Sequence, residues 1–201
     1  MARAPHLKAN LGWAWIQSET KEAYSLLREH IVKRGFCITA AVLDGRTGIS
    51  RVFLDIPVQI CQFHQMRIVK RKLTLRPETA AGQELLSIAL KLAKTNQENL
   101  ERELGEWHKK YQEFLNEKTY TIGCRNWSYT HRRVRSAYLS LRRNMPYLFT
   151  YQRYPELHIP NTTNSLDGYF SRLKNLFSAH RGKSRERIRK IAREILRRQT
   201  A

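Results

Sequence analysis

Two aspartates and a cysteine–histidine pair are the residues of this chain whose types and spacing could do chemistry. Asp44 follows the apolar and β-branched run 36–43 and precedes Gly45. Such a run predicts a strand that is buried on both faces, with Asp44 at its carboxyl end. Ligands of open α/β sheets bind beyond the carboxyl ends of the strands, so Asp44 is a candidate active-site residue. The alternative is that Asp44 only stabilises the following turn, because Asp-Gly is a common turn pair.

Cys61 and His64 lie in the segment 58–64, which is the next predicted strand. We expect a short helix or turn around 49–53 to join the two strands, so that this pair lies beside Asp44. A Cys/His nucleophilic enzyme is disfavoured, because residues three apart near a strand end point in different directions and no third orienting group is evident. The three cysteines, Cys37, Cys61 and Cys124, are odd in number and widely spaced, which suits a reducing cytosol and excludes a CxxC zinc site.

Asp167 follows a run of polar residues at 161–165 that predicts the start of a helix. The helix is expected to place Leu166, Phe170, Leu173 and Phe177 against the core. Asp167 lies beside this stripe, where a carboxylate is favoured by the helix dipole. Its role is therefore either chemical or only dipole-stabilising.

The composition predicts a polyanionic partner. The chain has 201 residues, with 37 Lys and Arg against 17 Asp and Glu, for a formal net charge of +20. Such an excess repels itself unless an anion offsets it, and nucleic acid is the leading candidate. No run of the length needed to cross a membrane is present, and the N-terminus lacks the apolar core of a signal peptide.

Arginines without counter-charge occupy residues 125–153, interleaved with aromatic residues. The planar guanidinium donates two hydrogen bonds at once to a phosphate, so this segment predicts a surface that faces DNA or RNA rather than a merely solvated face. The arginines are Arg125, Arg132, Arg133, Arg135, Arg142, Arg143 and Arg153.

The predicted elements alternate at first and are then helical. A strand over 11–16, a helix over 21–33 capped by Ser18 or Thr20, and the strand 36–43 predict a parallel or mixed sheet. Apolar stripes predict further helices: one continuing from Gln65 to Leu73, one through 85–92, one that starts at a Thr95–Glu98 capping box, and one over 130–143. Gly182 is predicted to end the helix that bears Asp167, and Ser184 is predicted to start the last helix of the chain. The fold class is thus α/β and α-rich, with a helical insertion from about 77 to 154.

Three blocks together resemble the Mutator-like insertion-sequence transposases, especially their zinc-binding variant branch. The blocks are 42–49 (VLDGRTGI), 59–65 (QICQFHQ) and 160–174 (PNTTNSLDGYFSRLK), with a helical region between the second and the third. The resemblance covers nearly the whole chain, from about Trp13 to Leu196. It implies a DDE-type transposase that cleaves phosphodiesters and transfers strands with two metal ions in DNA transposition.

The resemblance also implies a fold and a set of residue roles. It implies a ribonuclease-H-like core, here with its N-terminal part in 1–76, the helical insertion in 77–154 and closing helices in 155–201. Asp44 matches the second catalytic aspartate, Asp167 falls where the family usually has a glutamate, and both would hold Mg²⁺ or Mn²⁺. Cys61 and His64 match a family signature beside the site. DNA contacts are expected from Arg132, Arg133, Arg135, Arg142, Arg143, Asn164, Arg172 and Lys174.

Two departures from the family pattern are visible. Residues 1–10 supply no aspartate in place of the family's first one, and the upstream DNA-recognition region is missing, so the chain resembles an N-terminally truncated, inactive copy. Asp167 is one methylene shorter than glutamate, and a displacement of about one ångström can cost on the order of a hundredfold in rate. The expected partners are double-stranded DNA at the transposon ends and target, and a second copy of the intact enzyme. The expected location is a prokaryotic cytoplasm, at the nucleoid. The alternative is a basic DNA-binding protein without catalysis.

Overall fold

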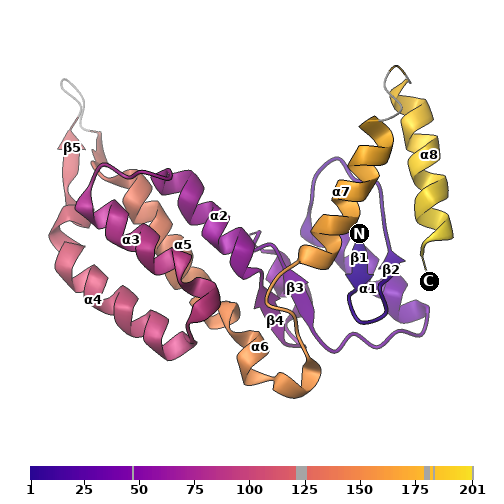
Figure 1. Cartoon of the computed structure of the whole chain (residues 1–201), viewed down its shortest axis with the longest axis horizontal. Helices are drawn as coiled ribbons and strands as arrows, with labels where there is room; N and C mark the ends of the chain where they lie inside the picture. The colour runs from indigo at the N-terminus through magenta and orange to yellow at the C-terminus, as the bar shows by residue number, and fades with distance from the viewer. Residues whose placement is uncertain (47, 121–125, 179–181, 183, 201) are drawn as a thin grey trace. The chain divides into compact units, whose positions relative to one another are not determined.

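Helices dominate the chain, and its strands form only small sheets. The computed structural model describes residues 1–200 except 47, 121–125, 179–181 and 183. Of the described residues, 61% are helical. The described strands pair in three two-stranded sheets (Figure 1). The predicted α/β, α-rich class is therefore confirmed at this coarse level.

Two compact units make up the chain. Unit 1 contains residues 1–39, 46–56 and 163–201, and unit 2 contains residues 40–45 and 57–162. Cys124 and Arg125 lie outside the described residues. The division into the two parts of a ribonuclease-H-like core and an insertion stays a prediction.

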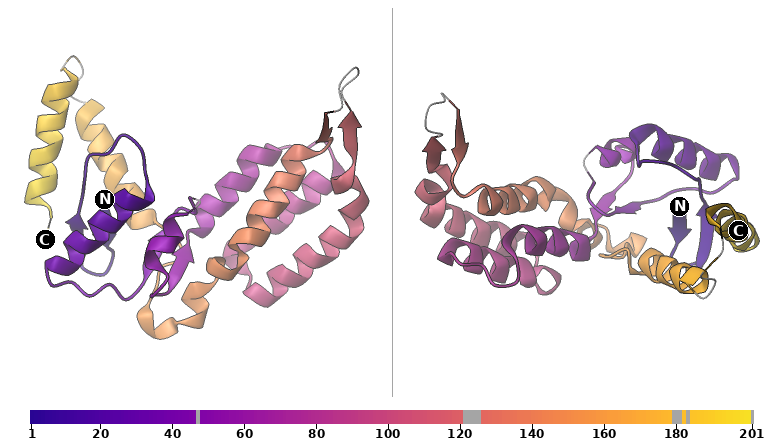
Figure 2. Two further views of the ribbon diagram at one scale, coloured as in Figure 1. Left: turned by 180° about the vertical axis from the view of Figure 1, so that it is seen from behind. Right: turned by 90° about the horizontal axis from the view of Figure 1, so that it is seen from above.

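Unit 1 begins with an antiparallel hairpin of β1 (Ala2–Ala4) and β2 (Ala9–Gly12). Helix α1 (Lys21–Lys33) contacts the 3-10 helix η1 (Ile49–Phe53). Helices α7 (Asn164–Ser178) and α8 (Arg185–Arg198) run antiparallel beside each other (Figure 2). Tyr169 and Leu173 of α7 form a small apolar cluster with Leu196 of α8.

Unit 2 holds the parallel pair of β3 (Ala41–Leu43) and β4 (Val58–Ile60) and a bundle of helices. The helices are α2 (Gln62–Leu73), α3 (Ala80–Leu90), α4 (Gln97–Asn116) and α5 (Arg132–Leu148). The short helices η2 (Leu92–Lys94), α6 (Thr150–Arg153) and η3 (Pro155–Leu157) and the hairpin of β5 (Lys118–Tyr120) and β6 (Trp127–Tyr129) complete the unit.

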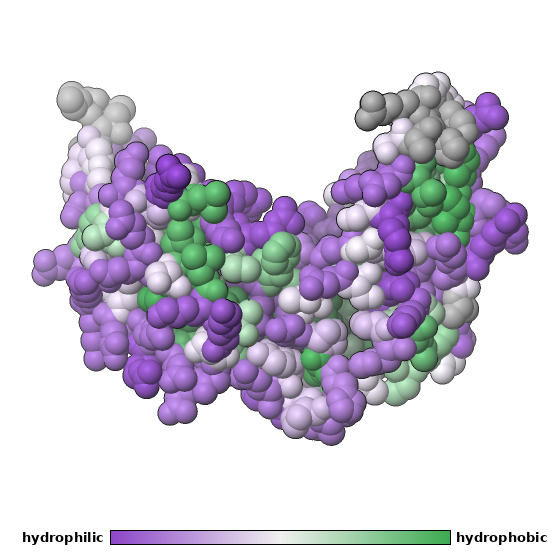
Figure 3. Space-filling model, viewed as in Figure 1, coloured by the Kyte–Doolittle hydropathy of each residue, from purple (hydrophilic) through white to green (hydrophobic). Residues whose placement is uncertain are grey.

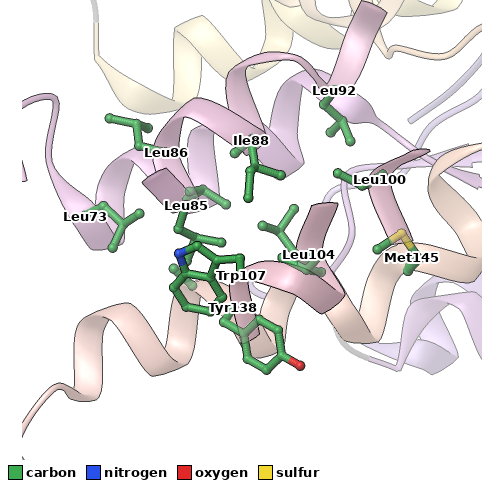
Figure 4. Packing of buried hydrophobic residues seen from close by; sticks show 14 of the residues in the cluster. Leu73, Leu85, Leu86, Ile88, Leu92, Leu100, Leu104, Trp107, Tyr138 and Met145 are labelled. Atoms are coloured by element: carbon green, nitrogen blue, oxygen red, sulfur yellow. The ribbon is translucent and has the colours of Figure 1, made fainter. Parts of the chain in front are cut away.

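The core of unit 2 lies between its helices. Leu85, Leu104 and Trp107 are almost fully buried, and Figure 4 shows them facing one another with side chains of α5. The Trp107 indole also donates a hydrogen bond of 3.0 Å to the Ala81 carbonyl. Each fully buried side chain of this size contributes about 1.5–3 kcal/mol. The apolar stripes predicted from the sequence are therefore confirmed as core.

Local capping explains why most of the predicted helices form. The Thr20 hydroxyl accepts from the Ala23 amide at 3.3 Å, and α1 spans the predicted residues 21–33. Ser184 caps α8 in the same way. The predicted cap of α4 is wrong by one residue: the amide oxygen of Asn96, not Thr95, accepts from the Asn99 amide at 2.9 Å. An asparagine is among the strongest N-caps, so it outcompetes its neighbour.

The predicted strands are mostly too long. The segment Trp13–Ile16 forms no strand, whereas residues 1–10, for which the sequence predicts no element, form β1 and the first half of β2. Trp13 instead packs against the small cluster of unit 1. Within the described chain, β3 pairs only with β4 over three residues and is half-buried, so the predicted burial on both faces is wrong.

The second predicted strand, 58–64, ends at Ile60. Helix α2 begins at Gln62, whose amide N–H donates to the Asn161 carbonyl at 3.0 Å. A partner distant in the sequence thus satisfies one of the first N–H groups of the helix. Helix α5 also runs five residues beyond the predicted end, because Met145 and Leu148 in its last turn are buried. No helix of the described chain is both long and apolar enough to span a bilayer.

Candidate active-site edge and nucleic-acid surface

Asp44 lies where the sequence places it, directly after β3. Its side chain is exposed, and Gly45 turns the chain with a φ of +84°. A β-carbon at Gly45 would make a tight contact of 3.2 Å with the Ile60 side chain, and the positive φ itself favours glycine. The Cys61 amide donates to the Leu43 carbonyl at 2.7 Å, which extends the parallel pairing by one residue. Asp44 and Cys61 therefore lie at the carboxyl ends of two paired strands.

Cys61 and His64 contact each other. The Cys61 sulfur is fully buried and lies 3.3 Å from Nδ1 of His64. Cys61 is the residue before α2 and His64 lies in its first turn, and residues three apart on a helix share one side. The expectation that the two side chains point in different directions is therefore wrong, because it assumed a strand. The contact holds the Cys61 thiol and the His64 ring together at the start of α2.

A network of buried amides holds this edge together, and sequence reasoning missed it. Gln59 and Gln62 both donate to the Leu148 carbonyl at 2.9 Å. Asn161 donates to the Gln62 side chain at 3.1 Å, and Asn144 donates to Gln65 at 2.7 Å. These contacts join β4 and the start of α2 to α5 and to the segment before α7. The spacing of three between the glutamines, in a segment that is otherwise largely apolar, is the signal that could have revealed them.

Asp167 lies in the first turn of α7, as expected, and is half-buried. Its Oδ2 accepts a hydrogen bond of 2.8 Å from the Thr163 hydroxyl, and its amide donates to the Thr163 carbonyl at 3.0 Å. The apolar face of α7 differs slightly from the prediction: Tyr169 and Leu173 are buried, whereas Phe170 is 40% exposed. Asp167 belongs to unit 1 and Asp44 to unit 2. Their approach to a common metal ion stays a prediction.

Two of the five arginines predicted to bind DNA from α5 make contacts within the protein. Arg133 donates to the carbonyls of Lys72 at 2.7 Å and Arg71 at 3.3 Å, at the end of α2. Arg135 donates to the Leu115 carbonyl and the Asn116 side chain at the end of α4, and lies over the Tyr129 ring at 3.9 Å. Both side chains satisfy carbonyls that a helix end leaves unpaired.

The remaining predicted contact residues lie on the surface. The exposed group is Arg132, Arg142, Arg143, Asn164, Arg172 and Lys174. Within the described residues, no Asp or Glu forms an ion pair with the arginines or the lysine of this group. Arg132, Arg142 and Arg143 are therefore exposed on α5, and their contact with DNA stays a prediction.

No group of three or more His, Cys, Asp or Glu among the described residues could hold a metal ion. Comparisons with protein-family models, curated proteins and solved structures find no match for the chain.

Proposed function

We propose that this chain carries part of a DNA strand-transfer site of the three-acid transposase type, with Asp44 and Asp167 as its metal ligands. The observation that carries the proposal is the edge formed by β3 and β4. Asp44 follows one parallel strand, and Cys61 with His64 follows the other. This order is the one that the resemblance to Mutator-like transposases implies, with a ribonuclease-H-like core around the edge.

The donor set fits Mg²⁺ or Mn²⁺, which prefer carboxylate and water ligands. Asp44 is exposed, and the described partner of the Asp167 carboxylate is a neutral hydroxyl. Bound ions of this kind would stabilise the charge that develops on the attacking and leaving oxygens of the phosphodiester. In this proposal Asp44 and Asp167 hold the ions, and the exposed arginines of α5 hold the DNA backbone. Efficient strand transfer requires a third acid in addition to these two.

Mn²⁺ binding, followed by electron paramagnetic resonance, tests the proposed metal site. We expect Asp44→Asn and Asp167→Asn each to weaken binding about tenfold or more, and the double variant to lose little beyond either one, because both acids serve one site. Asp167→Glu should tighten binding, since it supplies the longer acid that the resemblance implies. Glu156→Gln, which removes an exposed acid in η3, is the control. Unchanged Mn²⁺ affinity in Asp44→Asn would contradict the proposed transposase function.

A DNA-binding protein without catalysis is the second candidate, favoured by the exposed side chains of Arg132, Arg142 and Arg143 on α5. Both candidates predict that duplex affinity falls with salt, by roughly 0.9 log units per log unit of salt for each phosphate neutralised. Only the transposase predicts a metal dependence that is lost with Asp44. A flat salt response would contradict both candidates.

A further inference from the structure

A groove in unit 1 lies outside the β3–β4 edge described above and includes Arg172, one of the exposed residues predicted to contact DNA. Its volume is about 700 Å³, within the range of pockets that bury small ligands. Residues of the β1–β2 hairpin form one side of it, including Arg3, Lys8 and Asn10, and residues of α7 and α8 form the other. All of the residues that line it belong to one compact unit.

The polar lining of the groove is cationic. Arg3, Lys8, Arg172 and Arg198 line it, and no Asp or Glu is found among the described residues of the lining. Glu194 bonds to Arg198 at 2.6 Å and also to Arg197, so one charge of the lining is offset. The remaining excess of positive charge favours an anion, and arginine guanidinium groups suit phosphate in particular.

Asn10 supplies an unused donor in the wall of this groove. The side chain is fully buried, and Arg3 donates to its Oδ1 at 2.8 Å. That bond fixes the amide orientation, because the opposite orientation would set two donors against each other. Nδ2 of Asn10 has no acceptor among the described residues. A buried donor without an acceptor is costly, and the oxygen of an anion in the groove would satisfy it.

The groove also has an apolar side. Leu173, Leu176 and Ile195 line it, and Leu176 is 50% exposed. Figure 3 shows apolar side chains gathered between α7 and α8, with hydrophilic ones around them. Phosphate alone would leave this side uncovered. The phosphates of a duplex lie outside its stacked bases, whereas an unpaired nucleotide presents a phosphate together with the face of a base.

We infer that this groove binds an unpaired nucleotide of a nucleic acid strand. The phosphate lies against Arg172, Arg198 and Lys8, with Asn10 as a further donor, and the base lies against Leu176 and Ile195. The inference rests on the proposed function only in taking nucleic acid as the ligand. It adds a preference for single-stranded segments and assigns it to residues that the metal site does not use.

Fluorescence anisotropy with a labelled single-stranded oligonucleotide, and with the same oligonucleotide as a blunt duplex, tests the inference. We expect Arg172→Gln to weaken single-strand binding about tenfold and duplex binding much less. Asn10→Asp keeps the acceptor for Arg3 but replaces the donor with a charged oxygen, so it should weaken single-strand binding at least as much. Arg193→Gln removes the same charge from an exposed position of α8 outside the groove and is the matched control. Circular dichroism confirms that each variant is folded.

The outcomes separate this inference from the proposed function. Equal losses of affinity in Arg172→Gln and Arg193→Gln, or equal losses of affinity for single strand and duplex, would contradict nucleotide binding in the groove. Neither result would contradict the proposed function. Inorganic phosphate that competes as strongly, per mole, as the oligonucleotide would show that the ligand is a free anion and would also overturn the inference of nucleotide binding. Absence of binding to either nucleic acid would contradict both inferences.

Discussion

Buried amide side chains stabilise the edge that bears Asp44. Gln62 is 2% exposed, donates to the Leu148 carbonyl and accepts from Asn161. Both bonds cross between segments that are distant in the sequence. A buried amide contributes only modestly while it is paired, but its loss leaves its partners unsatisfied. These side chains therefore position the ends of β4 and α5 rather than taking part in chemistry.

Gln62→Leu should lower the free energy of unfolding by about 1–3 kcal/mol, because the Asn161 amide then lacks its buried acceptor. Urea unfolding followed by circular dichroism measures this change. Gln112→Leu, at an exposed position of α4, is the control and should change stability by less than about 0.5 kcal/mol. Equal stability of the two variants would show that the network contributes nothing measurable.

Substitutions of two neighbouring arginines on α5 should affect protein stability and DNA binding separately. Arg133→Ala removes the donors at the end of α2 and should lower the free energy of unfolding by about 1 kcal/mol. Arg132→Ala removes an exposed side chain and should leave stability nearly unchanged but weaken duplex binding. Thermal unfolding and fluorescence anisotropy of both variants measure the two effects. Loss of DNA affinity in Arg133→Ala alone would contradict this division of roles.

At the scale of elements, an ion pair joins α1 to the chain after η1. Arg28 donates to both carboxylate oxygens of Asp55, at 2.7 Å to Oδ1, and also to the Val52 carbonyl. The hydrogen bonds from Arg28 lower the pKa of Asp55 below its usual value. A lowered pKa in the folded state means that the pair stabilises above the unfolded pKa and stops doing so as the pH falls through the folded one.

Asp55→Asn should therefore lower the unfolding temperature at neutral pH, and the difference from the wild type should shrink as the pH falls below the unfolded pKa of about 3.9 and through the lower folded pKa. Thermal unfolding at several pH values gives this comparison. The Asp55 side chain is 60% exposed, so the effect should be small and should shrink with added salt. A difference that persists unchanged at low pH would exclude the ion pair as its cause.

At the scale of the whole molecule, the apolar clusters differ in size. Among the described residues, the main cluster of unit 2 contains twenty buried residues, whereas the cluster between α7 and α8 contains three. Stability follows the buried apolar area, so the units should open at different free energies. We expect the amides of α7 and α8 to exchange with deuterium before those of α3, α4 and α5.

Hydrogen exchange with mass spectrometry tests this order with two matched variants. Leu173→Ala should speed exchange in α7 and α8 only, and Leu85→Ala should speed it in α2 to α5 only. Both leucines are buried in the cluster of their own unit. Simultaneous exchange of all helices in the wild type would show that the chain unfolds as one cooperative unit.

The helices could be predicted from the sequence because their signals are local. Apolar spacing and capping residues indicated α1, α4 and α8 within a few residues of their observed bounds. The end of β3 was placed correctly as well, since Asp44 and Gly45 form a local turn signal, whereas the predicted strand 58–64 ends four residues early, at Ile60. The hairpins β1–β2 and β5–β6 were missed, because their three- or four-residue strands have no clear alternation.

By itself, the sequence determined the excess of positive charge, the α-rich class and the positions of most helices, all of which depend on composition or on neighbours a few residues apart. Only the tertiary structure decided that His64 lies on a helix beside Cys61, that Arg133 and Arg135 stabilise helix ends, and that Asn10 is left with an unused donor. The reason is that a polar side chain takes its role from the partner it meets on folding. That partner often lies tens of residues away in the chain.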